Sequence, residues 1–353
     1  MPTDVPEPAH SGVPTPLSQG ASGLASFRSP WWLPGGHLQT IWAARLALAH
    51  QGPAPVFRRE RWDTPDGDFI DVDFAFESAP DAEARPAPPP KPMLVLFHGL
   101  EGSSTGHYSL AMADEARRRG WAYAVPHFRG CSGELNRAPR AYHSGDFEEI
   151  AWILARLRAR THAPPVVVGI SLGGNALMRW AAEAGASAAQ CARAVVSVCS
   201  PLDLAAAGEA IDQGFNRQVY ARMFLATMKP KALAKLAQHP GLFDGQRLRA
   251  VRTLREFDDV FTGPLHGFAG TDDYWARAAA KPHLPRIRIP ALAVNARNDP
   301  FIPAHSLPRQ GHAGQVELWQ PAHGGHVGFA CGAPPGHLQA MPRAVLDWLS
   351  QHC

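Results

Sequence analysis

Two short stretches of the sequence place a serine between two glycines, a spacing that suits a nucleophile. Gly102–Gly106 reads GSSTG and Gly169–Gly173 reads GISLG, and both fit the Gly-x-Ser-x-Gly pattern of a serine on a sharp strand-to-helix turn. Ser171 has that context, because the apolar run VVVGI precedes it and the helical pattern LGGNALMRWAAEA follows it. Ser104 lacks it, because the loop HGLEGSS separates this serine from its strand. We therefore predict Ser171 as the nucleophile.

The loop around Ser104 receives a different prediction. Acyl transfer from such a turn needs two N–H donors for the oxyanion, one from the residue after the nucleophile and one from the loop after the third strand. Leu172 follows Ser171, and Leu100 follows His98 and Gly99 in the loop. We predict the amides of Leu100 and Leu172 as the oxyanion hole. The alternative for the loop is an ordinary glycine-rich surface turn.

An orienting carboxylate is the next requirement, because a serine needs a base and the base needs an acid partner. On this kind of turn the chain order is Ser, then Asp or Glu, then His. Only Asp299 lies just beyond a buried-looking strand, ALAVNA, in the turn RNDPFIP. We predict Asp299 as the acid. The competing aspartates, for which helix capping or solvated charge is the favoured interpretation, are Asp203, Asp212, Asp244, Asp258, Asp259, Asp272 and Asp273.

The base is expected near the C-terminus, where HGGHVGF follows the last predicted strand. His323 and His326 both qualify by chain order. We predict His326, because it lies deeper in the loop and Val327 and Phe329 can hold it. A metal site at this His-x-x-His pair is not expected, because no H-E-x-x-H motif accompanies it. No cofactor is needed for this chemistry.

The elements that would position these residues form an alternating pattern of strands and helices. The sequence predicts eight strands, of which the first two are antiparallel and the rest parallel, and helices on both faces of the sheet. The strands are predicted at Val56–Trp62, Phe69–Phe76, Met93–Phe97, Trp121–Val125, Val166–Ile170, Ala194–Cys199, Ala291–Asn295 and Val316–Trp319. The flanking helices are predicted at Tyr108–Arg119, Phe147–Arg160, Asn175–Ala184 and Met341–Gln351.

The chain is predicted to be one domain, residues 29–353, after a disordered segment at residues 1–28 that is rich in Pro, Ser and Gly. Strand patterns are absent between the sixth and seventh strands. Helical patterns such as Asn216–Met228 and Lys231–Gln238 occur there instead. We predict a helical cap at about residues 203–288, over the carboxyl edge of the sheet where ligands of parallel sheets bind.

Composition excludes several other classes of protein. The chain has 353 residues, 45% of them apolar, and a net charge of +3, which is too small and too scattered to favour nucleic acid as a partner. It has five widely spaced cysteines and no C-x-x-C, so reduced thiols in the cytoplasm are expected rather than a disulfide framework. There is no secretory signal and no run long enough to span a membrane, so no stable membrane insertion is expected.

A longer set of motifs occurs in order along the chain and resembles the YheT-like branch of the α/β-hydrolases, which is close to the abhydrolase-domain lipases and esterases of eukaryotes. The motifs are GGHLQTIW (35–42), HGLEGSS (98–104), HFRGCSGELNR (127–137), YHSGD (142–146), GISLGGN (169–175), REFDD (255–259), NDPF (298–301) and GGHVGF (324–329). The resemblance implies an α/β-hydrolase fold, with Ser171, Asp299 and His326 as nucleophile, acid and base.

Two departures from the family pattern matter. Gly35-Gly36 stands where the family often has Asn-Pro, and Asn298-Asp299 stands where an acidic pair is frequent. The second departure leaves Asp299 as the one carboxylate at that place. The resemblance assigns no chemistry to His37, Arg129, Glu134, His143 or Asp146. We expect structural roles for the last four of these: Arg129 and Glu134 in a buried ion pair beside Asn136, with His143 and Asp146 bracing the loop near Ser171.

The sequence predicts a serine carboxylesterase or lipase-type hydrolase that cleaves short-chain acyl esters or acylglycerols through an acyl-enzyme. An acyltransferase that uses the same three residues is the alternative, since the choice of acceptor lies in the cap. A ligand-binding protein that kept only the fold is disfavoured, because all three residues are present. Acyl length and oligomeric state cannot be read from the sequence, although cap residues Phe215, Met223, Phe224, Leu225 and Met228 could line an apolar pocket.

Overall fold

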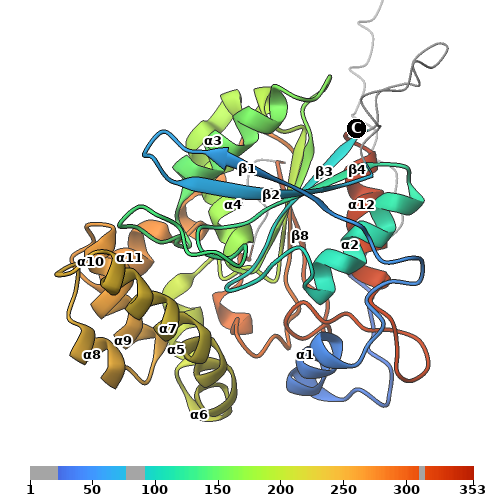
Figure 1. Cartoon of the computed structure of the whole chain (residues 1–353). Helices are drawn as coiled ribbons and strands as arrows, with labels where there is room; N and C mark the ends of the chain where they lie inside the picture. The colour runs from blue at the N-terminus through green and yellow to red at the C-terminus, as the bar shows by residue number, and fades with distance from the viewer. Residues whose placement is uncertain (1–22, 77–91, 310–314) are drawn as a thin grey trace, which may run out of the picture.

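The computed structural model describes residues 23–76, 92–309 and 315–353 of the chain. Eight strands form one sheet in the order β1-β2-β4-β3-β5-β6-β7-β8 (Figure 1). Strands β1 and β2 pair antiparallel to each other and β2 pairs antiparallel to β4, whereas all other pairs are parallel. The strands are β1 Arg58–Asp63, β2 Phe69–Ala75, β3 Met93–Phe97, β4 Ala122–Pro126, β5 Val166–Ile170, β6 Ala194–Val198, β7 Ala291–Val294 and β8 Val316–Trp319. Each predicted strand is therefore present within a few residues of its expected bounds.

Helices cover both faces of this sheet, as expected. Alternate residues of β3 divide between two hydrophobic clusters, Val95 joining one and Leu94 the other, because successive side chains of a strand point to opposite faces. Helices α3 (Phe147–Arg158) and α4 (Leu172–Ala184) pack on the first face, and α2 (His107–Arg118) and α12 (Ala340–Ser350) pack on the second. Burial on both faces explains why MLVLF and VVVGI are apolar throughout.

Between β6 and β7 the described structure contains only helices and turns. We call residues 203–288 the helical insertion. It lies beyond the sheet as a separate group of helices (Figure 1). Its α and π elements are α5 Leu204–Ile211, α6 Gly214–Asn216, η2 Arg217–Ala221, α7 Arg222–Gln238, α8 Gly245–Ala250, α9 Leu254–Phe257, η3 Asp258–Thr262, α10 Gly263–Leu265 and α11 Thr271–Ala278. Three short 3₁₀ turns complete the fold, η1 Gly185–Gln190, η4 Lys281–Arg286 and η5 Ala304–Ser306.

The helical insertion differs from the sequence prediction in one respect. Helical pieces were expected at 216–228 and 231–238, with Pro230 between them. The structure instead has a single α7 that runs through Pro230. The helix is held on both sides of the proline, since Leu225 precedes it and Ala232 and Lys235 follow it as buried residues. Tertiary packing has here outweighed the local preference of proline against a helix interior.

The N-terminal region contains a helix that the sequence patterns did not predict, α1 at Gly35–Arg45. The predicted disorder falls largely on residues 1–22, which lie outside the described residues. Residues 23–28 pack on the protein, because Leu24 is buried and the Phe27 ring lies 5.5 Å from that of Phe329. Within the described residues, no helix has the length and apolar character needed to cross a bilayer.

Candidate active site

Ser171 lies between the last residue of β5 and the first residue of α4. Its backbone adopts φ 52° and ψ −119°, a conformation that costs free energy for any residue with a Cβ. The neighbouring glycines permit this turn: a Cβ on Gly169 would come 2.5 Å from the Cα of Gly174, and a Cβ on Gly173 would come 2.4 Å from the carbonyl oxygen of His98. The sequence context that selected Ser171 therefore corresponds to a strained turn that directs its side chain outward.

The side chains of Ser171, His326 and Asp299 form a continuous hydrogen-bonded chain. His326 Nε2 lies 3.0 Å from Ser171 Oγ, and His326 Nδ1 lies 2.8 Å from Asp299 Oδ2. Because a carboxylate only accepts, Nδ1 carries the proton, which leaves Nε2 as the acceptor of the serine hydroxyl. Asp299 is fixed in turn by the N–H of Phe301, which donates to Oδ1 at 2.8 Å. The structure thus brings together the three residues predicted from chain order.

These residues reach one place from separate strands. Ser171 follows β5, Asp299 lies in the turn after β7 and His326 lies in the loop after β8. The carboxyl ends of parallel strands lie at the same edge of a sheet, which is where open α/β sheets bind ligands. His323, the alternative base, instead accepts a hydrogen bond through Nδ1 from the N–H of Ser29 at 3.3 Å. Its role in the described structure is therefore to hold the N-terminal region.

Ser104 has a structural role. Its hydroxyl donates to Asp73 Oδ2 at 2.5 Å, and the side chain is buried. Asp73 also accepts hydrogen bonds from Arg59 and His127. These contacts hold the pKa of Asp73 well below its usual range, against the opposing effect of burial. The first serine motif thus supports the loop after β3 and does not present a nucleophile.

The loop after β3 places Leu100 beside Ser171. Its turn is closed by the Gly102 N–H, which donates to the carbonyl of Gly99 at 2.9 Å, and the Gly99 N–H donates to the Tyr108 hydroxyl at 3.0 Å. Leu100, Ser171 and Leu172 line the same cavity. Both predicted oxyanion donors are therefore on residues that border the nucleophile.

Helix α1 supports the histidine loop, a role that sequence reasoning missed. Thr40 Oγ1 accepts the N–H of His326 at 2.8 Å, and Gln39 Oε1 accepts the N–H of Gly324 at 2.9 Å. The Gln39 oxygen also accepts the Asn298 amide at 2.9 Å, which joins the turn of the acid to the same helix. The motif GGHLQTIW thus supplies the polar contacts that hold the acid and the base. Its polar residues Gln39 and Thr40 were the sequence signal that could have indicated this role.

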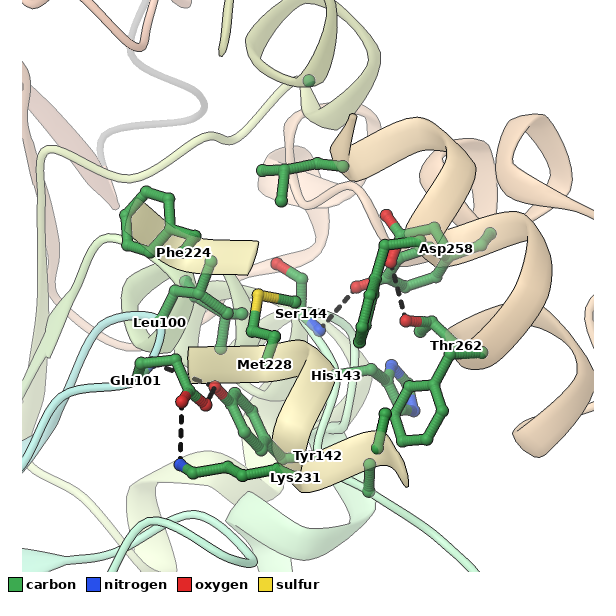
Figure 2. Close-up of a pocket in the computed structure, with 18 of the residues that line it drawn as sticks. Leu100, Glu101, Tyr142, His143, Ser144, Phe224, Met228, Lys231, Asp258 and Thr262 are labelled. Carbon is green, nitrogen blue, oxygen red and sulfur yellow. Dashed lines mark hydrogen bonds and ion pairs between the residues drawn. The ribbon is translucent and has the colours of Figure 1, made fainter. Parts of the chain in front are cut away.

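Two cavities adjoin Ser171. The first extends beneath the helical insertion, and Figure 2 shows Leu100 and Phe224 on one side of it and Asp258 and Thr262 on the other. The second lies between α1 and the start of α7, and His326 lines it. Both are lined largely by apolar side chains, and they share Ser171, Leu100, Phe224 and Phe301. The nucleophile is therefore accessible from two apolar spaces.

Asp258 and His143 are among the titratable groups of the first cavity whose pKa values are altered. Burial raises the pKa of Asp258 to about 7, although its carboxylate accepts hydrogen bonds from Thr262 and Trp275. Burial also lowers the pKa of His143 to about 3, with a smaller contribution from Arg140. His143 lines the cavity, so it contributes to the pocket as a neutral side chain at pH 7.

The buried ion pair expected for Arg129 and Glu134 is found for Arg129 alone. Arg129 is buried in an ion cluster with Asp68 at 2.7 Å and with Glu149, as expected for a structural role. Glu134 is not part of it, because its exposed carboxylate instead pairs with Arg61 at 2.7 Å. That expectation was wrong, since the glutamate extends from the loop toward solvent.

The other three residues make distinct contacts. Asn136 donates to Asp68 at 2.7 Å, and Asp146 accepts from Arg140 at 2.5 Å. His37 joins α1 to the helical insertion through the Tyr220 hydroxyl at 3.2 Å. These contacts connect the core, the first helix and the insertion around the site.

One group of three described residues brings metal-ligating atoms close together, Cys199, Asp299 and His326. The thiol of Cys199 is fully buried, and burial raises its pKa well above the usual value. Cysteine binds a metal as the thiolate, and His326 already uses both nitrogens toward Asp299 and Ser171. The group therefore fits proton transfer better than metal binding.

Comparison with known proteins identifies the family. A family model described as the alpha/beta hydrolase fold matches residues 92–332. The chain belongs to the alpha/beta hydrolase family. It is 41% identical over 320 residues to YheT of Escherichia coli, named as a candidate esterase, and the match covers 90% of each chain. It is 28% identical to mouse phospholipase ABHD3, over 84% of this chain and 72% of that protein.

More distant matches are consistent with the same family. A yeast monoacylglycerol lipase is 28% identical over 68% of this hydrolase and 55% of its own length. The crystal structure of a puromycin hydrolase matches with a TM-score of 0.54 at 18% identity, over 84% of this chain and 39% of that one, which shows the fold alone. The predicted YheT-like family, the α/β-hydrolase fold and the class of carboxylic ester hydrolase are thus confirmed.

Proposed function

We propose that this hydrolase cleaves carboxylic esters through an acyl-enzyme on Ser171. The observation that carries the proposal is the Ser171–His326–Asp299 chain of contacts at 3.0 and 2.8 Å, on a turn that presents the serine to two cavities. A serine hydroxyl is a weak nucleophile without an adjacent base, and a base is held in one tautomer by such an acid. The geometry supplies both conditions.

The reaction proceeds in two balanced halves. Ser171 Oγ attacks the ester carbonyl while His326 Nε2 takes its proton, and the oxyanion is stabilised by the N–H groups of Leu100 and Leu172. The intermediate collapses, His326 gives the proton to the departing alcohol, and an acyl-serine remains. Water then attacks with His326 as base, and the carboxylic acid leaves with Ser171 restored. Asp299 stays ionised and holds the Nδ1–H tautomer throughout.

The cavities favour an ester with apolar groups on both sides of its carbonyl. The first is walled by residues such as Leu204, Phe224 and Phe261, and the second by Ile41, Val219 and Met223. The proposed substrates are therefore short-chain acyl esters or acylglycerols. The helical insertion, residues 203–288, acts as the cap that covers the first cavity. The names of the lipase and phospholipase relatives agree with such a substrate class.

A pair of serine variants tests this proposal. Ser171→Ala is expected to abolish p-nitrophenyl butyrate hydrolysis, because it removes the attacking oxygen. Ser104→Ala is the matched control and is expected to keep most of the turnover, since its hydroxyl only supports Asp73. Initial rates of both variants, with circular dichroism to check folding, decide the point. Activity that survives in Ser171→Ala and disappears in a folded Ser104→Ala would overturn the assignment.

A further inference from the structure

The residue after Leu100 has an unusual backbone. Glu101 adopts φ 57°, in the left-handed region where a residue with a Cβ is uncommon and strained. A glycine or asparagine would suit this position better on backbone grounds alone. Strain of this kind persists only where the surroundings hold the residue firmly. The glutamate side chain must therefore make contacts that a glycine could not.

Those contacts come from two directions. The Tyr142 hydroxyl donates to Glu101 Oε1 at 2.9 Å and accepts the Glu101 backbone N–H at 3.0 Å. On the other side, Lys231 Nζ lies 2.8 Å from Glu101 Oε2 (Figure 2). Both carboxylate oxygens and the backbone amide of Glu101 are thus engaged. The residue is held as a unit, and with it the Leu100–Glu101 peptide, which shares the Leu100 Cα with the peptide that carries the Leu100 N–H.

The ion pair joins two parts of the fold. Glu101 lies in the loop after β3, whereas Lys231 lies on α7 of the helical insertion. The Glu101 side chain is only 10% exposed, and that of Lys231 is 39% exposed. A fully exposed pair contributes little, but here the carboxylate is largely removed from water, so loss of the lysine leaves a buried charge with one polar partner fewer.

We propose that Lys231 and Glu101 are positioning residues that hold the Leu100 amide in place for the oxyanion, so that the helical insertion sets the geometry of the oxyanion hole. This inference rests on the proposed function, because it takes Leu100 as a donor. Release of the pair lets the loop relax from its strained conformation and moves the amide away from the developing charge. An oxyanion donor acts on the transition state more than on the bound ester, so the effect falls on kcat.

The test compares Lys231→Met with wild-type enzyme on p-nitrophenyl butyrate. We expect kcat to fall by about tenfold or more, less than the 10²–10³-fold loss of a whole oxyanion donor, with KM changed less than about twofold. Lys231→Arg restores a cation and is expected to recover most of the rate. Glu101→Gln is expected to resemble Lys231→Met, and the double variant to lose no more than either single one.

A matched control is available in the same region. Lys281 pairs with Asp203 at 3.1 Å at the base of the helical insertion and is 35% exposed, similar to Lys231. It does not line either cavity. Lys281→Met removes an ion pair with a similarly exposed lysine, although Asp203 is 32% exposed against 10% for Glu101. The variant does not alter the loop after β3, and it is expected to leave kcat within about twofold of wild type.

A trifluoromethyl ketone provides a second readout, because the oxygen of Ser171 adds to its carbonyl carbon and forms a tetrahedral oxyanion. Its inhibition constant is expected to rise in Lys231→Met in proportion to the loss of kcat, and to recover in Lys231→Arg. If Lys231→Met is folded and keeps wild-type kcat and inhibition, or if Lys281→Met loses as much, the positioning role is refuted. That result would leave the proposed function intact. The proposed function is refuted by a different result, retained activity in Ser171→Ala.

Discussion

At the scale of single residues, the site depends on side chains whose roles follow from what they contact. Ser104 and Ser171 share a sequence pattern, yet one donates to buried Asp73 and the other meets His326. The contacts among Ser171, Asp299 and His326 could be predicted because strand, turn and chain order constrain where these residues lie. The Glu101–Lys231 pair could not, because it depends on how two distant segments pack, and no local pattern encodes that contact.

Asp258 provides a residue-scale prediction for stability. Burial raises its pKa to about 7 in the folded protein, above the value of about 4 for an unfolded aspartate. The folded state therefore binds the proton more tightly, and this group makes stability fall as pH rises from about 4 to 7. Asp258→Asn keeps a neutral side chain at every pH, so the free energy of unfolding of the variant should improve relative to wild type between pH 5 and pH 8.

Urea unfolding of both proteins at pH 5, 6, 7 and 8 measures this difference. The gain should level off above pH 7, where wild-type Asp258 is already ionised. A difference between the two proteins that does not change with pH would show that Asp258 titrates normally. The variant and the wild type share every other titratable group. Histidines such as His143 therefore contribute equally to the pH dependence of the free energy of unfolding of both proteins.

At the scale of elements, the strands were predicted closely and α1 was not. Central strands such as β3 and β5 are apolar and buried on both faces, so they carry a strong local signal, as VVVGI does at β5. Helix α1 lacks an apolar stripe, because two of its three buried residues are Gln39 and Thr40. These polar residues are buried for their hydrogen bonds to the loops of the acid and the base. The two helical pieces expected on either side of Pro230 instead belong to one helix, α7, which packing keeps whole.

The α1 contacts give an element-scale prediction. Thr40→Val removes the oxygen that accepts the His326 N–H while it keeps nearly the same shape. The loop that carries His326 includes the positive-φ residues Val327 and Phe329, so it needs such support to keep its conformation. Because small displacements of a catalytic group can cost up to about 10²-fold, we expect kcat to fall roughly tenfold with little change in KM.

Thr40→Ser is the control for this variant, since it retains the hydroxyl and loses only a methyl group. It should keep most of the wild-type kcat. Steady-state kinetics on p-nitrophenyl butyrate measure both variants. Equal kcat values for Thr40→Val and Thr40→Ser would show that the threonine oxygen does not position His326.

At the scale of the whole molecule, three regions meet at one edge of the sheet. The core contributes Ser171, Asp299, His326 and the loop after β3. Helix α1 holds the loops of the acid and the base, and the helical insertion encloses the first cavity and reaches the loop through Lys231. The choice of ester is expected to depend on the insertion and α1, because they supply much of the lining of the two cavities.

Whether Ser171 is the nucleophile is tested most directly by identifying the residue that reacts with a fluorophosphonate, which modifies a serine activated by a neighbouring base. The native protein is labelled, digested and analysed by tandem mass spectrometry, with heat-denatured protein as the control. We expect one modified residue, Ser171, in native protein alone, with loss of ester hydrolysis in proportion to labelling. Modification of Ser104 instead, or full inhibition with Ser171 unmodified, would contradict it.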